Sequence, residues 1–129
     1  RGLGDVYKRQ IDYSSNQITG VPTHTVISEI RFDRNEFVAK VSFRNIGKIP
    51  IDDSNSIFTE NYSLLNLKIS KSFNLGKTNL SVLTGVDNIF DVKYASGVVI
   101  NARGFGGRDP RYYYPGLPRN YFISLSFSL

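Results

Sequence analysis

The segment NYFISLSFSL, residues 120–129, decides the fold of this chain. Large apolar side chains occupy every second position in it, and the positions between them hold serines and one phenylalanine. The alternating apolar residues are Tyr121, Ile123, Leu125, Phe127 and Leu129. A period of two residues places these side chains on one face of an extended strand. The segment therefore predicts a β-strand with one apolar and one polar face.

The same alternation recurs in four earlier segments. The predicted strands cover about residues 24–33, 36–45, 62–73, 79–90 and 119–129. Each is about 10–12 residues long, whereas strands in soluble proteins usually have five or six residues. A tilted strand that crosses a bilayer needs roughly 9–11 residues. The sequence therefore predicts an all-β chain, an antiparallel up-and-down meander of about five long strands.

The connections between these strands differ strongly in length. Tight turns are predicted around Arg34–Asn35 and at Gly76, whereas the segments 46–61 and 91–118 are long. Short turns on one side and long loops on the other are typical of outer-membrane barrels. A structureless loop as long as 91–118 is unusual in a compact soluble domain. The connections therefore favour a membrane barrel.

Aromatic residues lie toward both ends of the apolar faces. Those near the short turns are Phe32, Phe37, Phe73 and Phe127, and those near the long loops are Phe43, Phe90 and Tyr121. Two aromatic bands with aliphatic residues between them are expected at the two bilayer interfaces. In the alternative interpretation, these aromatic residues belong to the core of an ordinary soluble β-sandwich.

Lys71 lies on the apolar face beside Phe73, and we expect its ammonium to reach the lipid headgroups.

Composition excludes several functional classes. The chain has no cysteine and a single histidine, His24, so thiolate sites and two-histidine metal sites are excluded. The chain contains no run of about 18 apolar residues, so no transmembrane helix is predicted. The net charge of +5 is scattered, which argues against nucleic-acid binding. His24 is interpreted as a residue of the sheet rim.

No arrangement of residues suggests catalysis, so we expect no enzyme, no cofactor and no metal site. Asp52 and Asp53 are adjacent in a loop and are interpreted as turn formers. Asp87 and Asp91 flank Asn88 at the end of the fourth predicted strand. There we expect the strand to end with local capping.

The string RGLGDVYKRQ, residues 1–10, resembles translated sequencing-library adaptor, with a polar loop as the alternative. The expected organisation is therefore an adaptor-derived or disordered segment 1–10 followed by one folded portion, 11–129. Since the chain contains no Met, we expect that its first residue is not a natural start.

Four stretches of the chain carry a family resemblance. They are GVPTHT (20–25), DDSNS (52–56) with YSLLNLKIS (62–70), GVDNIFDVKY (85–94) and GRDPRYYYPGLPRNYFISLSFSL (107–129). The third is the most specific and is close to a G-V-x-N-L-F-D-x-x-Y run. In this order, after the first ten residues, the chain resembles the C-terminal end of a TonB-dependent outer-membrane receptor.

The resemblance implies a barrel of about 22 strands around a plug, in the outer membrane of a Gram-negative bacterium. It implies energised uptake of a scarce ligand, above all a ferric siderophore or another small-molecule iron chelate. The implied partners are outer-membrane lipid and lipopolysaccharide, the barrel-assembly machinery and the TonB complex, the last through an N-terminal region. In this family the assembly machinery reads the closing strand. Tyr121, Leu125 and Phe127 match that signal, whereas Leu129 stands where an aromatic residue is usual.

The segment 91–118 holds the candidate ligand-binding residues. They are Arg103, Arg108, Arg111, Tyr112 and Tyr113. Guanidinium groups beside aromatic rings suit anionic planar ligands such as carboxylate or catecholate chelates. In the alternative reading the tyrosines form an interfacial belt and the arginines bind lipopolysaccharide phosphates. A soluble extracellular β-sandwich binding module and the end of a passive porin are the rival interpretations of the whole chain.

Overall fold

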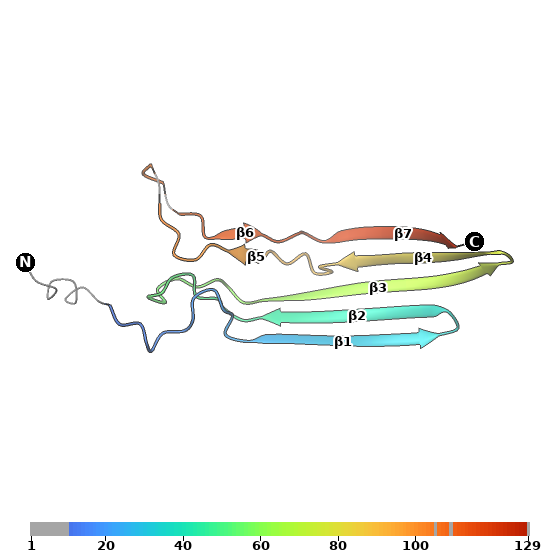
Figure 1. The fold of residues 1–129 in the computed structure, drawn as a ribbon, viewed down its shortest axis with the longest axis horizontal. Coiled ribbons are helices and arrows are strands. Elements are labelled where there is room, and N and C mark those ends of the chain that lie inside the picture. Colours follow the sequence, from blue (N-terminus) through green and yellow to red (C-terminus); the bar gives the residue numbers. More distant parts are fainter. Residues whose placement is uncertain (1–10, 105, 109, 129) are drawn as a thin grey trace, which may run out of the picture.

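A computed structural model describes residues 11–104, 106–108 and 110–128, so the adaptor-like segment 1–10 and Leu129 lie outside the described residues. Its main sheet contains five antiparallel strands in chain order (Figure 1). They are β1 (Thr25–Arg34), β2 (Phe37–Ile46), β3 (Tyr62–Leu75), β4 (Thr78–Asp87) and β7 (Asn120–Ser128). The prediction of an all-β chain with a five-stranded antiparallel meander is confirmed.

Two further strands lie in the segment that was predicted to be a loop, 91–118. β5 (Ala95–Val98) and β6 (Tyr113–Pro115) form a separate two-stranded antiparallel sheet. Their pairing is irregular between Ala95 and Gly97. The prediction of one long loop was therefore wrong, because strands of four and three residues are too short to show a period of two.

The two hairpin turns explain the tight connections. The β1–β2 turn consists of Asn35 (φ 48°) and Glu36 (φ 62°), one residue later than predicted, since Arg34 still pairs with Phe37. Positive φ at both central residues is the pattern of a type I′ turn. In the β3–β4 turn Gly76 comes first, with φ 79°, as type II′ requires. Both turns match the right-handed twist of the strands, so they hold the register of each hairpin.

The register gathers most of the apolar side chains of the five strands on one face. One cross-strand row runs from Ile30 through Val41, Leu67 and Val86 to Tyr121. Because side chains alternate between the two faces along each strand, this row determines on which face each of the remaining strand residues lies. The alternation predicted for each of the five strands is therefore confirmed as a single continuous apolar face.

The opposite face is mainly polar. On it Lys40 forms an ion pair with Glu29 at 2.9 Å, and the hydroxyls of Ser72 and Ser81 hydrogen bond at 2.9 Å. These groups satisfy one another across neighbouring strands. The two faces of the sheet therefore suit two different surroundings.

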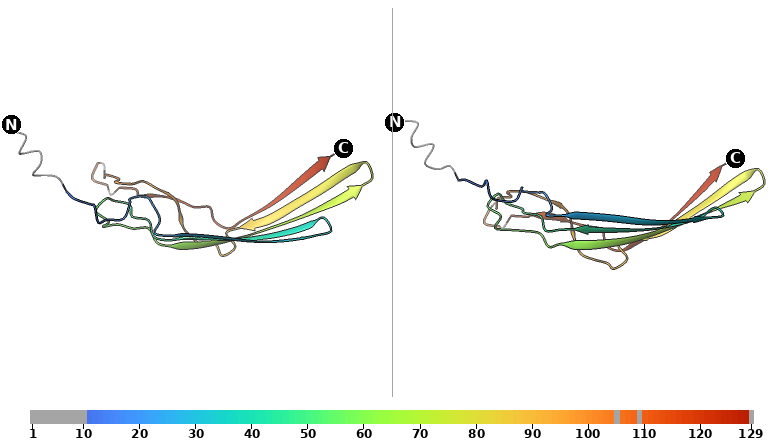
Figure 2. Two further views of the ribbon diagram at one scale, coloured as in Figure 1. Left: turned by 60° about the horizontal axis from the view of Figure 1, so that its bottom comes forward. Right: turned by 90° about the horizontal axis from the view of Figure 1, so that it is seen from below.

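The apolar face has no cover among the described residues. Figure 2 shows the strands as one curved layer with the loops at one end. Ile30 and Ile123 are 73% and 71% exposed, whereas the fully buried large side chains are Ile51 and Pro50, both outside the strands. None of the described residues belongs to a helix with the length and apolar character that a bilayer crossing demands. The fully buried large side chains thus lie in the connection between β2 and β3 and not in the sheet.

Candidate functional site

All the long connections lie at one end of the sheet, and both hairpin turns lie at the other (Figure 1). We call the first the loop end and the second the turn end. Residues 11–24, the β2–β3 connection and the β4–β7 connection make up the loop end. Polar side chains that bind backbone groups are concentrated there, which makes this end the candidate functional region.

Asp52 folds its own loop. Its carboxylate accepts hydrogen bonds from the Ile57 amide at 2.8 Å, from the Ser56 hydroxyl at 2.7 Å and from the Ser54 hydroxyl. The bonds from Ser54 and Ser56 lower the pKa of Asp52 to about 2. The interpretation of Asp52 as a turn former is confirmed.

Asp53 joins its loop to two distant segments. Its carboxylate accepts from the Thr19 hydroxyl at 2.6 Å and from the Asn101 side chain at 3.0 Å, and its amide donates to Asn101 Oδ1 at 3.1 Å. Asn16 adds a bond of 2.7 Å to the Asp53 carbonyl. Asp53 is thus more than a turn former, since it ties three segments into one platform.

Asn88 is the second organising residue, and only 4% of it is exposed. Its amide donates to Asn66 Oδ1 at 2.8 Å, and its side chain donates to the carbonyls of Val92 at 2.9 Å and Leu117 at 3.1 Å. Its side-chain oxygen accepts from the Val92 amide at 2.9 Å. These bonds satisfy a buried amide on both sides and join the end of β4 to the segment that leads into β7.

The predicted strand ending is confirmed, although β4 stops at Asp87 and not at residue 90. Asn88 has φ 54°, and this left-handed conformation ends the extended run. Asp91 also has φ 54°, and its carboxylate accepts from the Arg119 amide at 2.8 Å. The GVDNIFDVKY motif therefore ends one strand and positions the start of another.

A groove of about 470 Å³ lies beside the loop-end start of β3. Its rings come from Phe58, Tyr62, Tyr94 and Tyr113, and its charged residues are Glu60 and Lys93. The elements that supply them are the β2–β3 connection, β3, the β4–β5 connection and β6. The groove thus combines an aromatic wall with one group of each charge.

Tyr94 is held from two sides. Its ring lies 4.8 Å from that of Tyr62, with 33° between the planes. Gly116 packs against the other part of the ring so closely that an added Cβ would overlap it, and its amide donates to the Tyr94 carbonyl at 2.7 Å. The ring of Tyr94 is therefore packed against both Tyr62 and Gly116.

The five predicted ligand residues do not lie in one place. Tyr113 lines the groove, and Tyr112 is half-buried with its carbonyl accepting from the Val99 amide at 2.6 Å. Arg103, Arg108 and Arg111 are exposed on the connection between β5 and β6 and are not in the groove lining. The sequence analysis did not predict that Tyr62 and Tyr94 line this groove, although Tyr94 is the last residue of the GVDNIFDVKY motif.

The remaining predicted residues can be placed. Tyr121, Leu125 and Phe127 of the assembly signal are exposed on the apolar face of β7, whereas Leu129 lies outside the described residues. His24 directly precedes β1, and its Nε2 lies 2.8 Å from Asn45 Oδ1, as suits a residue of the sheet rim.

In the part of the chain that the structure describes, no three His, Cys, Asp or Glu residues gather as metal ligands. A comparison with models of known protein families finds no match to this chain.

Proposed function

We propose that this chain is the C-terminal part of a TonB-dependent receptor in the outer membrane of a Gram-negative bacterium. In this proposal the five long strands belong to a barrel of about 22 strands. The receptor takes up a scarce ligand, a ferric siderophore or a similar iron chelate. The observation that carries the proposal is the continuous, uncovered apolar face across five long strands.

The free energy of this face favours a lipid environment. Apolar area that leaves water gains roughly 25 cal/mol per Å², and a contiguous exposed apolar patch of this kind marks an interaction or membrane surface. Hydrocarbon chains would cover the residues that the sheet leaves exposed, such as Ile30, Leu125 and Phe127. Sheet edges must also be paired inside a bilayer, which requires a closed barrel of at least about eight strands.

The polar face supports an enclosed, hydrated interior. Lys68 lies 5.6 Å from the centre of the Phe122 ring on this face, beside the Glu29–Lys40 ion pair. Charged groups facing inward and aliphatic groups facing outward are the pattern of outer-membrane barrels. The loop end then faces the medium and the turn end faces the periplasm.

The loop end supplies the ligand contacts in this proposal. The packed rings of Tyr62 and Tyr94 offer an aromatic surface, and exposed Arg108 and Arg111 offer guanidinium groups to an anionic chelate. The other partners are lipopolysaccharide around the loops, the barrel-assembly machinery at β7 and the TonB complex through an N-terminal region.

Purification of the chain with and without detergent tests the proposal. We expect it to sediment as an aggregate in detergent-free buffer and to stay dispersed in detergent micelles. A compact monomer that unfolds cooperatively in plain buffer would support the soluble β-sandwich instead and would refute the receptor proposal.

A further inference from the structure

Two basic side chains flank an aromatic ring on the apolar face at the turn end. Arg34 is paired with Phe37 in the register of β1 and β2, and Phe37 is paired with Lys71 in that of β2 and β3. Neighbouring strands are about 4.8 Å apart, so the backbones of Arg34 and Lys71 are about 10 Å apart. Side chains of this length can meet at one small anion above the Phe37 ring.

The Lys71 ammonium is directed toward Arg34 and the turn. Lys71 Nζ donates a 2.7 Å hydrogen bond to the carbonyl of Asn35, the residue directly after Arg34. An ammonium has three N–H donors, and this bond uses one. The ammonium of Lys71 was expected to extend toward the headgroups. In the structure it is hydrogen bonded to Asn35 in the β1–β2 turn.

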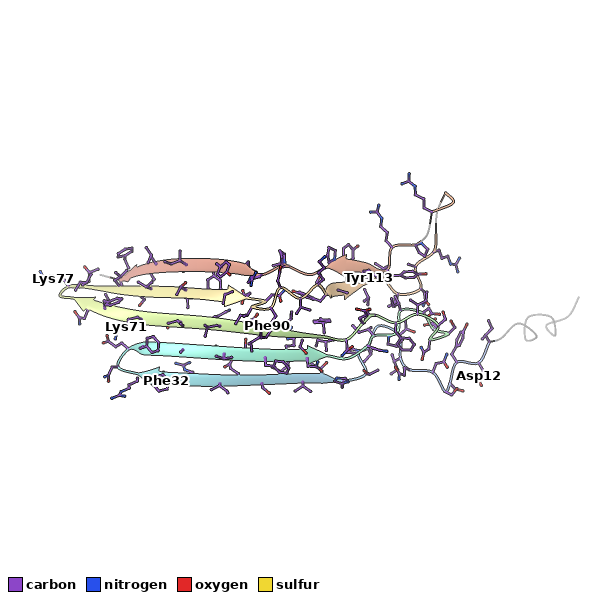
Figure 3. All side chains as sticks on the ribbon, turned by 180° about the vertical axis from the view of Figure 1, so that it is seen from behind. Asp12, Phe32, Lys71, Lys77, Phe90 and Tyr113 are labelled. Atoms are coloured by element: carbon purple, nitrogen blue, oxygen red, sulfur yellow. The ribbon has the colours of Figure 1, made fainter. Side chains whose placement is uncertain are left out.

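Aromatic rings form the surface around these two cations. Phe32 and Phe37 meet edge to face, with ring centres 6.4 Å apart. Phe32 is 54% exposed and Phe73 is 43% exposed on the same face. Figure 3 labels Phe32, Lys71 and Lys77 toward the same end of the sheet. The site thus has cations at its edge and an apolar floor, which suits an amphiphile.

The charge balance at the turn end is positive. Lys77 lies in the β3–β4 turn and Glu36 in the β1–β2 turn, while Asp33 belongs to the polar face and pairs with Arg31 at 2.8 Å. Glu36 is thus the one acid in the two hairpin turns, whereas Arg34, Lys71 and Lys77 are basic. An anionic headgroup is therefore attracted to this end.

We propose that Arg34 and Lys71 bind the phosphate of an anionic glycerophospholipid whose acyl chains lie over Phe32, Phe37 and Phe73. The proposal rests on the proposed function, because only a membrane barrel presents this face to lipid. Arginine binds phosphate oxygens in pairs, and lysine adds a point charge. A glycerophospholipid is favoured over lipopolysaccharide because the site lies at the end of the short turns, which face the periplasm in such barrels.

Lipid binding to the complete detergent-purified barrel tests the proposal. Native mass spectrometry would count bound phosphatidylglycerol, phosphatidylcholine with the same acyl chains, and lipid A. We expect wild-type barrel to prefer phosphatidylglycerol, and the Arg34→Gln/Lys71→Gln variant to bind it about tenfold more weakly or worse. The control Arg44→Gln/Lys68→Gln removes the same charge from the polar face and is expected to bind phosphatidylglycerol as wild type does.

Three results would overturn the lipid site: undiminished phosphatidylglycerol binding by the Arg34→Gln/Lys71→Gln variant, an equal loss in the control, or a preference for lipid A. If the double variant does not assemble, Arg34→Gln alone carries the test, because it keeps the Lys71–Asn35 bond. It should still weaken phosphatidylglycerol binding, and unchanged binding would count against the site.

Heat-modifiable migration of wild-type barrel on a gel separates the two proposals. Its absence refutes the membrane fold, whereas a folded barrel without lipid preference refutes the lipid site alone.

Discussion

The sheet and the loop end of this molecule are stabilised in opposite ways. In the sheet, residues as apolar as Ile123 are 71% exposed, and backbone pairing holds the strands together with a few cross-strand side-chain contacts such as the Lys40–Glu29 ion pair. In the loop end, Ile51 is fully buried, the side chain of Asn101 binds the backbone amide of Asp53, and the side chain of Asn88 binds the backbone carbonyl of Leu117. The loop end thus contains side chains that the chain itself buries, whereas the apolar face of the sheet can be covered only by molecules outside the described residues. A long regular strand is therefore not by itself evidence of a folded core.

The largest effect is expected from a charge placed on the apolar face of β7. In the proposed barrel, Ile123→Arg should reduce stability by about 2–4 kcal/mol, because the guanidinium would lie among acyl chains. Ser124→Arg, on the next residue and the opposite face, should cost far less. Urea unfolding of both variants in lipid vesicles measures the difference, and equal losses would show that the two faces meet the same medium.

The second effect concerns the loop end. Asn88→Ala leaves the Val92 amide and the carbonyls of Val92 and Leu117 without their side-chain partner. A buried group without a partner costs about 1–3 kcal/mol, so the variant should unfold at clearly lower urea concentration. Asn79→Ala changes an exposed asparagine at the turn end of β4 and serves as the control. If both variants unfold alike, the loop end does not depend on its buried amide.

A smaller effect is expected for ligand uptake. Tyr94→Ala removes a ring stacked on Tyr62, and aromatic pairs contribute about 0.5–1.5 kcal/mol. In the proposed receptor, losing a ring-to-chelate contact of the same size would correspond to a fall in apparent affinity for the iron chelate of about twofold to tenfold. The Arg108→Ala/Arg111→Ala variant tests the exposed arginines in the same uptake assay. Unchanged affinity there would rule out their binding role, and unchanged affinity in Tyr94→Ala would exclude the groove.

The smallest effect is a pH dependence of the β2–β3 connection. The Asp52 pKa is lowered from 3.8 to about 2, so the carboxylate stabilises the loop fully above 3.8. That contribution is lost as the pH falls through about 2. Hydrogen exchange of the Ile57 amide should therefore be protected down to pH 4 and should speed up near pH 2. Asp52→Asn should remove this transition, and an unaltered profile in that variant would assign it to another group.

Strand positions in the main sheet were predictable because a period of two is visible over about ten residues. The turn position was off by one, since Asn35 and Glu36 both adopt positive φ and only Asn is a usual residue there. β5 and β6 were missed because they are short and contain Gly97 and Pro115.

The loop end was largely unpredictable for a physical reason. Asp53 contacts Thr19 and Asn101, which lie 34 and 48 residues away in the sequence. No local sequence pattern specifies such hydrogen bonds, because they depend on how the strands position the connecting loops in space. Asn88 is the exception, because its partner Val92 is four residues away inside a recognisable motif.

The central claim is that the two faces of the sheet meet different media. The chain has no cysteine, so within it spin labels attach only to the single cysteines introduced at positions 121–128. In the complete barrel in phospholipid bilayers, labels at Tyr121, Ile123, Leu125 and Phe127 should collide mainly with dissolved oxygen, which concentrates in lipid. Labels at the positions between them should collide mainly with a water-soluble nickel complex. A profile without this two-residue alternation would contradict the account.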